Sequence, residues 1–264
     1  MFKIIAQYYV EQYSFLNLFN FITFRVGASI LTALFFSLIF GQYLINKISK
    51  IQPIGQPIRN DGPETHIIQK AGTPTMGGLL IILSVVISLI LWSDLQNTFV
   101  WIGFLALIFF GFIGFVDDYN KIRSNSSNGL KARTRIILQI FFALMISILV
   151  INNLDDHINT TISFPFFKNL IVNFGYFYLI ISLFIIVGSA NAVNLTDGLD
   201  GLAIVPVMIV AMTFAFIAYV SGNIVFSDYL LINYIPGTGE LSVLCGALIG
   251  ARSEEHTSEL QSPD

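Results

Sequence analysis

The chain has 264 residues, of which 55% are hydrophobic and only 11% are charged, and its formal net charge is −3. Soluble domains carry about 25% charged residues, so this composition excludes an ordinary soluble protein and indicates an all-α polytopic membrane protein. Cys245 is the one cysteine, which excludes an internal disulfide framework. The first strong apolar segment follows Asn20 and lacks the basic region and cleavage site of a signal peptide.

Apolar runs long enough to cross a membrane recur along the chain, since about 20 apolar residues span the hydrocarbon layer. Residues 1–20 are aromatic and mixed, and we expect a short helix at the membrane interface there. We predict six complete transmembrane helices, at about residues 21–45, 74–92, 98–116, 135–151, 174–190 and 202–220.

The basic residues predict the orientation of these spans. Two polar loops, 46–73 and 117–135, lie on the same side of the membrane and hold nine of the 13 basic residues: Lys47, Lys50, Arg59, Lys70, Lys121, Arg123, Lys131, Arg133 and Arg135. In the loops on the opposite side, Lys168 is the only basic residue. By the positive-inside rule, the basic loops are cytoplasmic and the N-terminus lies outside.

A seventh apolar run begins at Leu241 and stops at Ala251, after eleven residues, which is too short to cross a bilayer. The polar tail that follows, RSEEHTSELQSPD, resembles the in-frame translation of a sequencing-library adapter. We therefore expect residues 1–251 to form an incomplete membrane-embedded domain that ends within a truncated seventh helix. Residues 252–264 are expected to be an artefactual tail without function.

The third predicted span ends in two adjacent carboxylates, Asp117 and Asp118, within the stretch GFIGFVDDYN. If the helix ends there, both lie at its C-terminus, where the macrodipole already carries negative partial charge. Two further negative charges cost free energy unless a cation compensates, and lysines or a divalent metal ion with hard oxygen ligands can do so. Two solvated carboxylates at a membrane edge are the alternative that this stretch leaves open.

Two further polar stretches lie on the same predicted side. In residues 56–78, Thr73-Pro74-Thr75 is typical of a helix start, and a helix N-terminus near Lys70 is suited to binding a phosphate group. A plain connecting loop is the alternative.

In residues 191–203, Asp197 and Asp200 would share the first turn of the sixth span if that span begins there. Helix capping is the alternative, but it explains one of these acids and not both.

Three acid-bearing segments on one face of a membrane protein favour metal-assisted chemistry on a phosphorylated substrate. An ion or proton path is the competing interpretation, and a transporter would then be the non-enzyme alternative. Such a path would place acids within the spans, and the six predicted spans contain essentially none. The pattern therefore favours an enzyme.

Five stretches closely resemble one known family. They are QPIRNDGPETH (56–66), GTPTMGG (72–78), FVDDYNK (115–121), GLKAR (129–133) and NAVNLTDGLDGLA (191–203). In this order they resemble the phospho-N-acetylmuramoyl-pentapeptide transferase family, and the resemblance extends over about residues 20–250. The related UDP-N-acetylhexosamine:polyprenyl-phosphate N-acetylhexosamine-1-phosphate transferases share the aspartate pair and are the alternative, although they lack the first two stretches.

The resemblance implies a ten-helix, multi-pass enzyme of the bacterial inner (cytoplasmic) membrane, with its active site on the cytoplasmic face. It implies transfer of phospho-MurNAc-pentapeptide from UDP-MurNAc-pentapeptide to undecaprenyl phosphate in peptidoglycan biosynthesis, which forms lipid I and releases UMP. Mg²⁺ is the implied cofactor. The lipid bilayer and a second copy of the chain, in a homodimer, are the further partners we expect, and no nucleic acid is expected.

Residue by residue, the resemblance implies that Asp117 and Asp118 are the catalytic pair. The implied substrate-binding residues are Lys70, Thr75, Lys121, Arg133, Asn194, Asp197 and Asp200. Asp118 and Asp197 are the implied metal ligands. The family's later motifs, which hold its main metal-binding aspartate and a histidine-rich loop, are absent beyond Ala251, so we expect the 264-residue chain to be inactive.

The two aspartates allow two mechanisms. In the first, Asp117 orients or deprotonates the lipid phosphate in a single displacement, with Asp118 near the metal. In the second, one of the pair forms a covalent aspartyl-phosphate intermediate.

Overall fold

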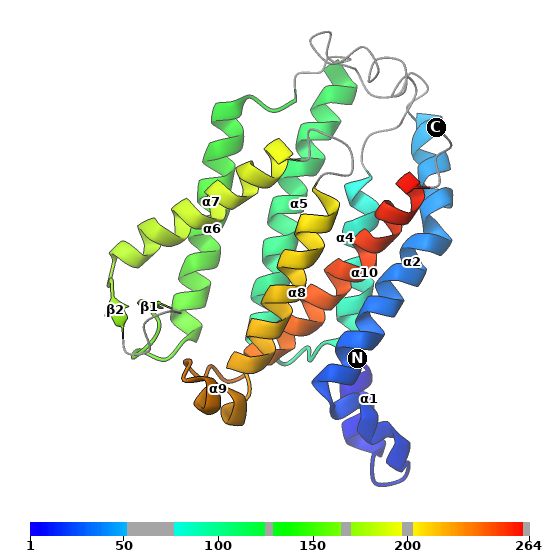
Figure 1. The fold of residues 1–264 in the computed structure, drawn as a ribbon. Helices are drawn as coiled ribbons and strands as arrows, with labels where there is room; N and C mark the ends of the chain where they lie inside the picture. The colour runs from blue at the N-terminus through cyan, green and yellow to red at the C-terminus, as the bar shows by residue number, and fades with distance from the viewer. Residues whose placement is uncertain (52–76, 125–128, 165–169, 197–202, 261–264) are drawn as a thin grey trace.

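The computed structural model describes residues 1–51, 77–124, 129–164, 170–196 and 203–260 (Figure 1). Most of the described chain is helical. The helices are α1 (Phe2–Tyr9), α2 (Ile22–Ile51), α4 (Gly78–Trp92), α5 (Thr98–Ser124), α6 (Ala132–Asn153), α7 (Phe177–Thr196), α8 (Ile204–Ser221), α9 (Ile224–Leu230) and α10 (Leu241–Leu260), with short 3-10 helices η1 (Ser14–Asn20) and η2 (Thr238–Glu240). Strands β1 (Thr161–Ser163) and β2 (Ile171–Asn173) pair in an antiparallel hairpin.

Five helices in the described part of the chain are long and apolar enough to cross a membrane: α2, α5, α6, α7 and α8. Helix α4 is as apolar, but its 15 described residues extend only about 22 Å, less than the hydrocarbon thickness of about 30 Å. The protein is therefore a multi-pass, all-α membrane protein, as its composition predicts.

The two ends of the helix bundle differ in what they carry. Helices α1 and α9 and the β-hairpin lie at one end (Figure 1). At the other end, α5 finishes and α6 begins, and the basic residues of the 117–135 loop lie there. The charge asymmetry expected from the sequence is thus an asymmetry between the two ends of the bundle.

Helix α10 packs between α2 and α8, and small residues allow its close approach to α2. Gly246 and Gly250 are spaced one helical turn apart and face α2. A Cβ at Gly246 would lie 2.8 Å from Ser29 Oγ, and one at Gly250 would overlap the Ile30 carbonyl group. Since lipid tails supply no hydrophobic driving force between helices, such small-residue contacts are what brings membrane helices together.

A buried ion pair joins α2 to the start of α10. Arg25 is 1% exposed and Glu240 is 4% exposed. The guanidinium binds the carboxylate through two contacts, Nη1 to Oε2 at 2.6 Å and Nη2 to Oε1 at 2.7 Å. Arg25 Nη1 also donates to the Trp92 carbonyl at 3.1 Å, and the Asp94 N–H donates to Glu240 Oε2 at 3.1 Å.

The N-terminal segment completes this cluster. Lys3 in α1 forms ion pairs with both Asp94 and Glu240. The N-terminal ammonium of Met1 donates to the Ile90 carbonyl at 2.7 Å and the Leu91 carbonyl at 3.1 Å, where the C-terminal partial charge of α4 favours a cation. These contacts fix the predicted interfacial helix against α4.

Two predicted helix ends were wrong. Helix α5 does not stop at Val116 but continues to Ser124, because Lys121 lies one turn beyond the aspartates and pairs with both. Helix α7 does not stop at Ala190 but continues to Thr196. Asn191, the first residue after the predicted end, donates to Gln139 Oε1 of α6 at 2.7 Å, so the amide is satisfied within the helix pair.

Two further segments differ from the sequence-based expectation. The predicted loop at 152–173 holds the β-hairpin, and the predicted loop at 221–240 holds α9. Helix α8 begins at Ile204, and Asp197 and Asp200, which we expected in its first turn, lie outside the described residues. Helix α10 extends past Ala251 to Leu260.

We expect Arg25→Met to lower the free energy of unfolding by about 3–5 kcal/mol, because the buried Glu240 would lose its bidentate partner and keep only Lys3, 3.4 Å away, as a counter-charge. The double variant Arg25→Met, Glu240→Leu should recover part of that loss, since it leaves no unpaired charge. Thermal unfolding in detergent micelles measures both. A double variant less stable than Arg25→Met alone would contradict this account of the pair.

The same pair predicts a pH dependence of stability. Burial by itself would raise the pKa of Glu240, but hydrogen bonding to Arg25 and the charges of Arg25 and Lys3 hold it below its ordinary value of 4.5. The stabilisation is therefore complete above about pH 4.5 and is lost as the pH falls through the lower, folded-state pKa. Melting temperatures measured from pH 7 downwards should fall less steeply for Glu240→Gln than for the native chain.

Candidate functional site

Asp117, Asp118 and Lys121 form a cluster of charges in the last two turns of α5. Lys121 Nζ lies 2.6 Å from Asp117 Oδ2 and 3.2 Å from Asp118 Oδ1. The spacing of three and four residues puts all three side chains on neighbouring positions of the helix surface. The lysine thus supplies the compensating cation that the adjacent carboxylates require.

The connection from α5 to α6 closes over Asp117. The N–H of Leu130 donates to Asp117 Oδ1 at 2.7 Å, so each oxygen of this carboxylate has a donor. Gly129 lies directly against the same group, since a Cβ there would overlap the Asp117 carboxylate. The Asp117 side chain is only 17% exposed.

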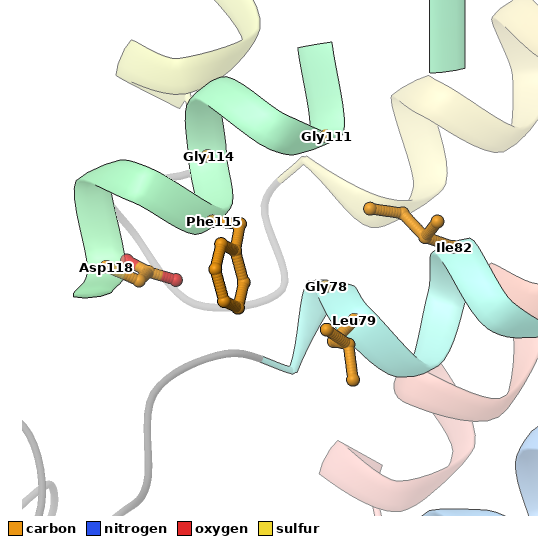
Figure 2. A pocket seen from close by; sticks show the side chains of 7 residues that line it. All are labelled: Gly78, Leu79, Ile82, Gly111, Gly114, Phe115 and Asp118. Atoms are coloured by element: carbon orange, nitrogen blue, oxygen red, sulfur yellow. The ribbon is translucent and has the colours of Figure 1, made fainter. Parts of the chain in front are cut away.

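Asp118 has a different environment. Its side chain is 30% exposed, and within the described residues only Oδ1 has a partner, Lys121. It lines a cavity of about 170 Å³ between α5 and the start of α4. Figure 2 shows the carboxylate on the side of α5 that faces Gly78 and Leu79. The other lining residues are Ile82, Gly111, Gly114 and Phe115.

The start of α4 lines this cavity through Gly78 and Leu79. Gly77 precedes the helix and has no side chain that could cap the first N–H groups. Helix N-termini favour anions because these N–H groups and the macrodipole both point outward. The cavity therefore joins a carboxylate, suited to a metal ion, to a helix start, suited to a phosphate.

The basic residues that follow lie in and before the first turn of α6. Lys131 and Arg133 are exposed, whereas Arg135 is half-buried. The Nε of Arg135 is buried and has no hydrogen-bond partner among the described residues. Sequence reasoning placed Arg133 near the substrate and counted Arg135 only as a loop charge. Their positions along α6 could have distinguished the two arginines, since Arg135 lies two residues further into the helix than Arg133.

The other predicted site residues are not brought to this cluster by the described structure. Asn194 is exposed in the last turn of α7, and its side chain forms no hydrogen bond with another described residue. Lys70, Thr75, Asp197 and Asp200 lie outside the described residues. The described part of the chain therefore contains the aspartate pair, Lys121, Arg133 and Asn194 from the predicted set.

A metal ion would need more ligands than the described part of the chain brings together. There, no group of three or more His, Cys, Asp and Glu side chains lies close enough to hold an ion. Asp118 offers a hard carboxylate oxygen facing the cavity, which suits Mg²⁺, an ion commonly held by one or two carboxylates together with substrate phosphates.

Comparisons with known proteins point to one family. The family model described as glycosyl transferase family 4 matches residues 100–251, which is more than half of the chain. The model described as phospho-N-acetylmuramoyl-pentapeptide-transferase signature 1 matches residues 70–82. The first match contains the Asp117–Asp118–Lys121 cluster, and the second contains the start of α4 that lines the same cavity.

Two curated relatives carry the same name, phospho-N-acetylmuramoyl-pentapeptide-transferase. The protein from Pelagibacter ubique is 51% identical over 92% of this chain and 67% of its own length. The protein from Rickettsia felis is 50% identical over 89% of this chain and 64% of its own length. The chain thus spans about two thirds of the length of these relatives. It belongs to glycosyl transferase family 4, and within it to the phospho-N-acetylmuramoyl-pentapeptide transferases.

Proposed function

We propose that the whole protein transfers phospho-MurNAc-pentapeptide from UDP-MurNAc-pentapeptide to undecaprenyl phosphate, forming lipid I and UMP. The observation that carries the proposal is the Asp117–Asp118–Lys121 cluster, whose Asp118 lines a cavity shared with the start of α4, inside the two matches to this family. The reaction would take place at the basic, cytoplasmic end of the bundle, in the bacterial inner membrane.

Phosphoryl transfer depends on positioning and charge neutralisation more than on covalent chemistry by the protein. The start of α4 would bind phosphate oxygens at the cavity, and Lys121, which pairs with the cavity-lining Asp118, would supply positive charge beside it. Asp117, with its carboxylate fixed, would orient the lipid phosphate through Lys121, because a carboxylate and a phosphate dianion repel each other unless a cation lies between them. At neutral pH a phosphate monoester is largely dianionic, since its second pKa is about 6, so orientation matters more than proton removal.

Mg²⁺ is the cofactor we propose, with Asp118 as its ligand in the described part of the chain and Asp197 as a second ligand. When bound, the ion would neutralise charge on the UDP diphosphate. Asn194 and Asp200 would contact the nucleotide, and Lys70 and Thr75 the diphosphate. The assignment of Asp118 as a metal ligand is supported by its place in the cavity lining and by its partly exposed side chain.

The transfer reaction is tested on a full-length chimera. Residues 1–251, where the family match ends, are joined to whatever part of the Pelagibacter ubique relative follows its matched region. We expect this chimera to convert UDP-[¹⁴C]MurNAc-pentapeptide and undecaprenyl phosphate to lipid I and UMP. The related transferase activity is tested with UDP-N-acetylglucosamine as the donor. Transfer from that donor alone would reject the proposed substrate.

Removal of divalent cations with EDTA should abolish transfer by the chimera, and Mg²⁺ should restore it. Asp118→Asn should raise the Mg²⁺ concentration needed for half-maximal rate about tenfold or more, because it removes one charged ligand. Asp228→Asn, at the opposite end of the bundle, is the matched control and should not change it. An unchanged Mg²⁺ dependence in Asp118→Asn would reject Asp118 as a ligand.

A further inference from the structure

Asp117 is held from two sides by different parts of the chain. Lys121 Nζ, on its own helix, lies 2.6 Å from Oδ2. The Leu130 N–H, from the connection to α6, donates to Oδ1 at 2.7 Å. Charge-assisted hydrogen bonds of this kind are stronger than neutral ones and fix the direction of the carboxylate. Asp118 lacks the second of these contacts in the described structure.

The contact from Leu130 depends on the residue before it. Gly129 lies so close to Asp117 that a Cβ there would lie 2.6 Å from Cγ and 2.7 Å from Oδ2. Any side chain at position 129 would therefore displace either the turn or the carboxylate. The displacement would lengthen or break the Leu130 hydrogen bond, because Gly129 and Leu130 are joined by one peptide bond and that bond carries the Leu130 N–H.

We propose that the Gly129–Leu130 turn is a positioning element, in which the absence of a side chain at Gly129 lets the Leu130 amide fix the Asp117 carboxylate for transfer. The inference rests on the proposed function, because it concerns how Asp117 is oriented for that reaction. Neither Gly129 nor Leu130 touches substrate in this account. Both act through Asp117.

Fixing this carboxylate separates the roles of the adjacent aspartates. The carboxylate of Asp118 remains directed to the cavity at the start of α4, whereas that of Asp117 is held toward the turn. Preorganised groups contribute most to catalysis, because they do not have to reorient during the reaction. A misplacement of about 1 Å can cost on the order of 100-fold in rate.

The hydrogen bond is tested by NMR on the purified 264-residue chain in micelles. Labelling glycine with ¹³C at the carbonyl and leucine with ¹⁵N selects the four Gly–Leu pairs of the sequence, at 78–79, 129–130, 198–199 and 201–202. The resonance that disappears in Gly129→Ala is that of Leu130. We expect Asp117→Ala to make this amide exchange with solvent about tenfold faster or more, whereas Asp118→Ala should change its exchange less than twofold.

The effect on transfer is tested on the chimera. Gly129→Ala should lower kcat about 10- to 100-fold and leave KM for both substrates within about twofold, because binding groups are untouched. Gly27→Ala is the matched control, since a Cβ there meets nothing within 4 Å, and it should keep the native kcat. A melting temperature for Gly129→Ala close to that of Gly27→Ala shows that the fold is kept.

Two results would overturn the proposal. The first is unchanged Leu130 exchange in Asp117→Ala, which would mean that the turn does not bind the carboxylate. The second is native kcat in Gly129→Ala. If the unmodified chimera forms no lipid I, the proposed function fails instead, and the NMR measurement alone decides whether the turn holds Asp117.

Discussion

Arg25 and Glu240 are 215 residues apart in the chain, and their buried, bidentate ion pair joins the first membrane helix to the last described one. A charge pair so buried needs further hydrogen bonds, and the Trp92 carbonyl and the Asp94 amide supply two of them, although Arg25 Nε has no partner among the described residues. The pair therefore also fixes the connection between α4 and α5. Further along α10, Gly246 and Gly250 allow that helix to pack closely against α2. The buried residues of α2, α4 and α10 form the core.

This arrangement determines where the aspartate pair lies. The charge cluster at one end holds α4 and α5 together as they turn, so their opposite ends lie side by side and enclose the cavity lined by Gly78 and Asp118. The carboxylates themselves require a cation, which Lys121 provides from within the same helix. Packing thus decides which helix start faces the aspartates, and local charge decides how far α5 extends.

The sequence predicted the parts of this structure that depend on composition and local pattern. Apolar runs of sufficient length identified the membrane helices, and the motifs around Asp117 identified the family. The helix ends were harder, because Asp117 and Asn191 look like loop residues until their partners, Lys121 and Gln139, are known. Arg25 carried no sequence signal of its role, since its partner lies 215 residues away. The Gly129 contact and the difference between Asp117 and Asp118 likewise depend on tertiary structure.

The central claim is that Asp117 and Asp118 together form the transfer site. Its most direct test is the rate of lipid I formation by the chimera when each residue is replaced separately by asparagine, which removes the charge but keeps the shape. We predict a fall in kcat of about 100-fold or more for each variant, with melting temperatures close to that of the unmodified chimera. If either variant keeps its rate within twofold, that aspartate takes no part in the reaction and the claim is wrong.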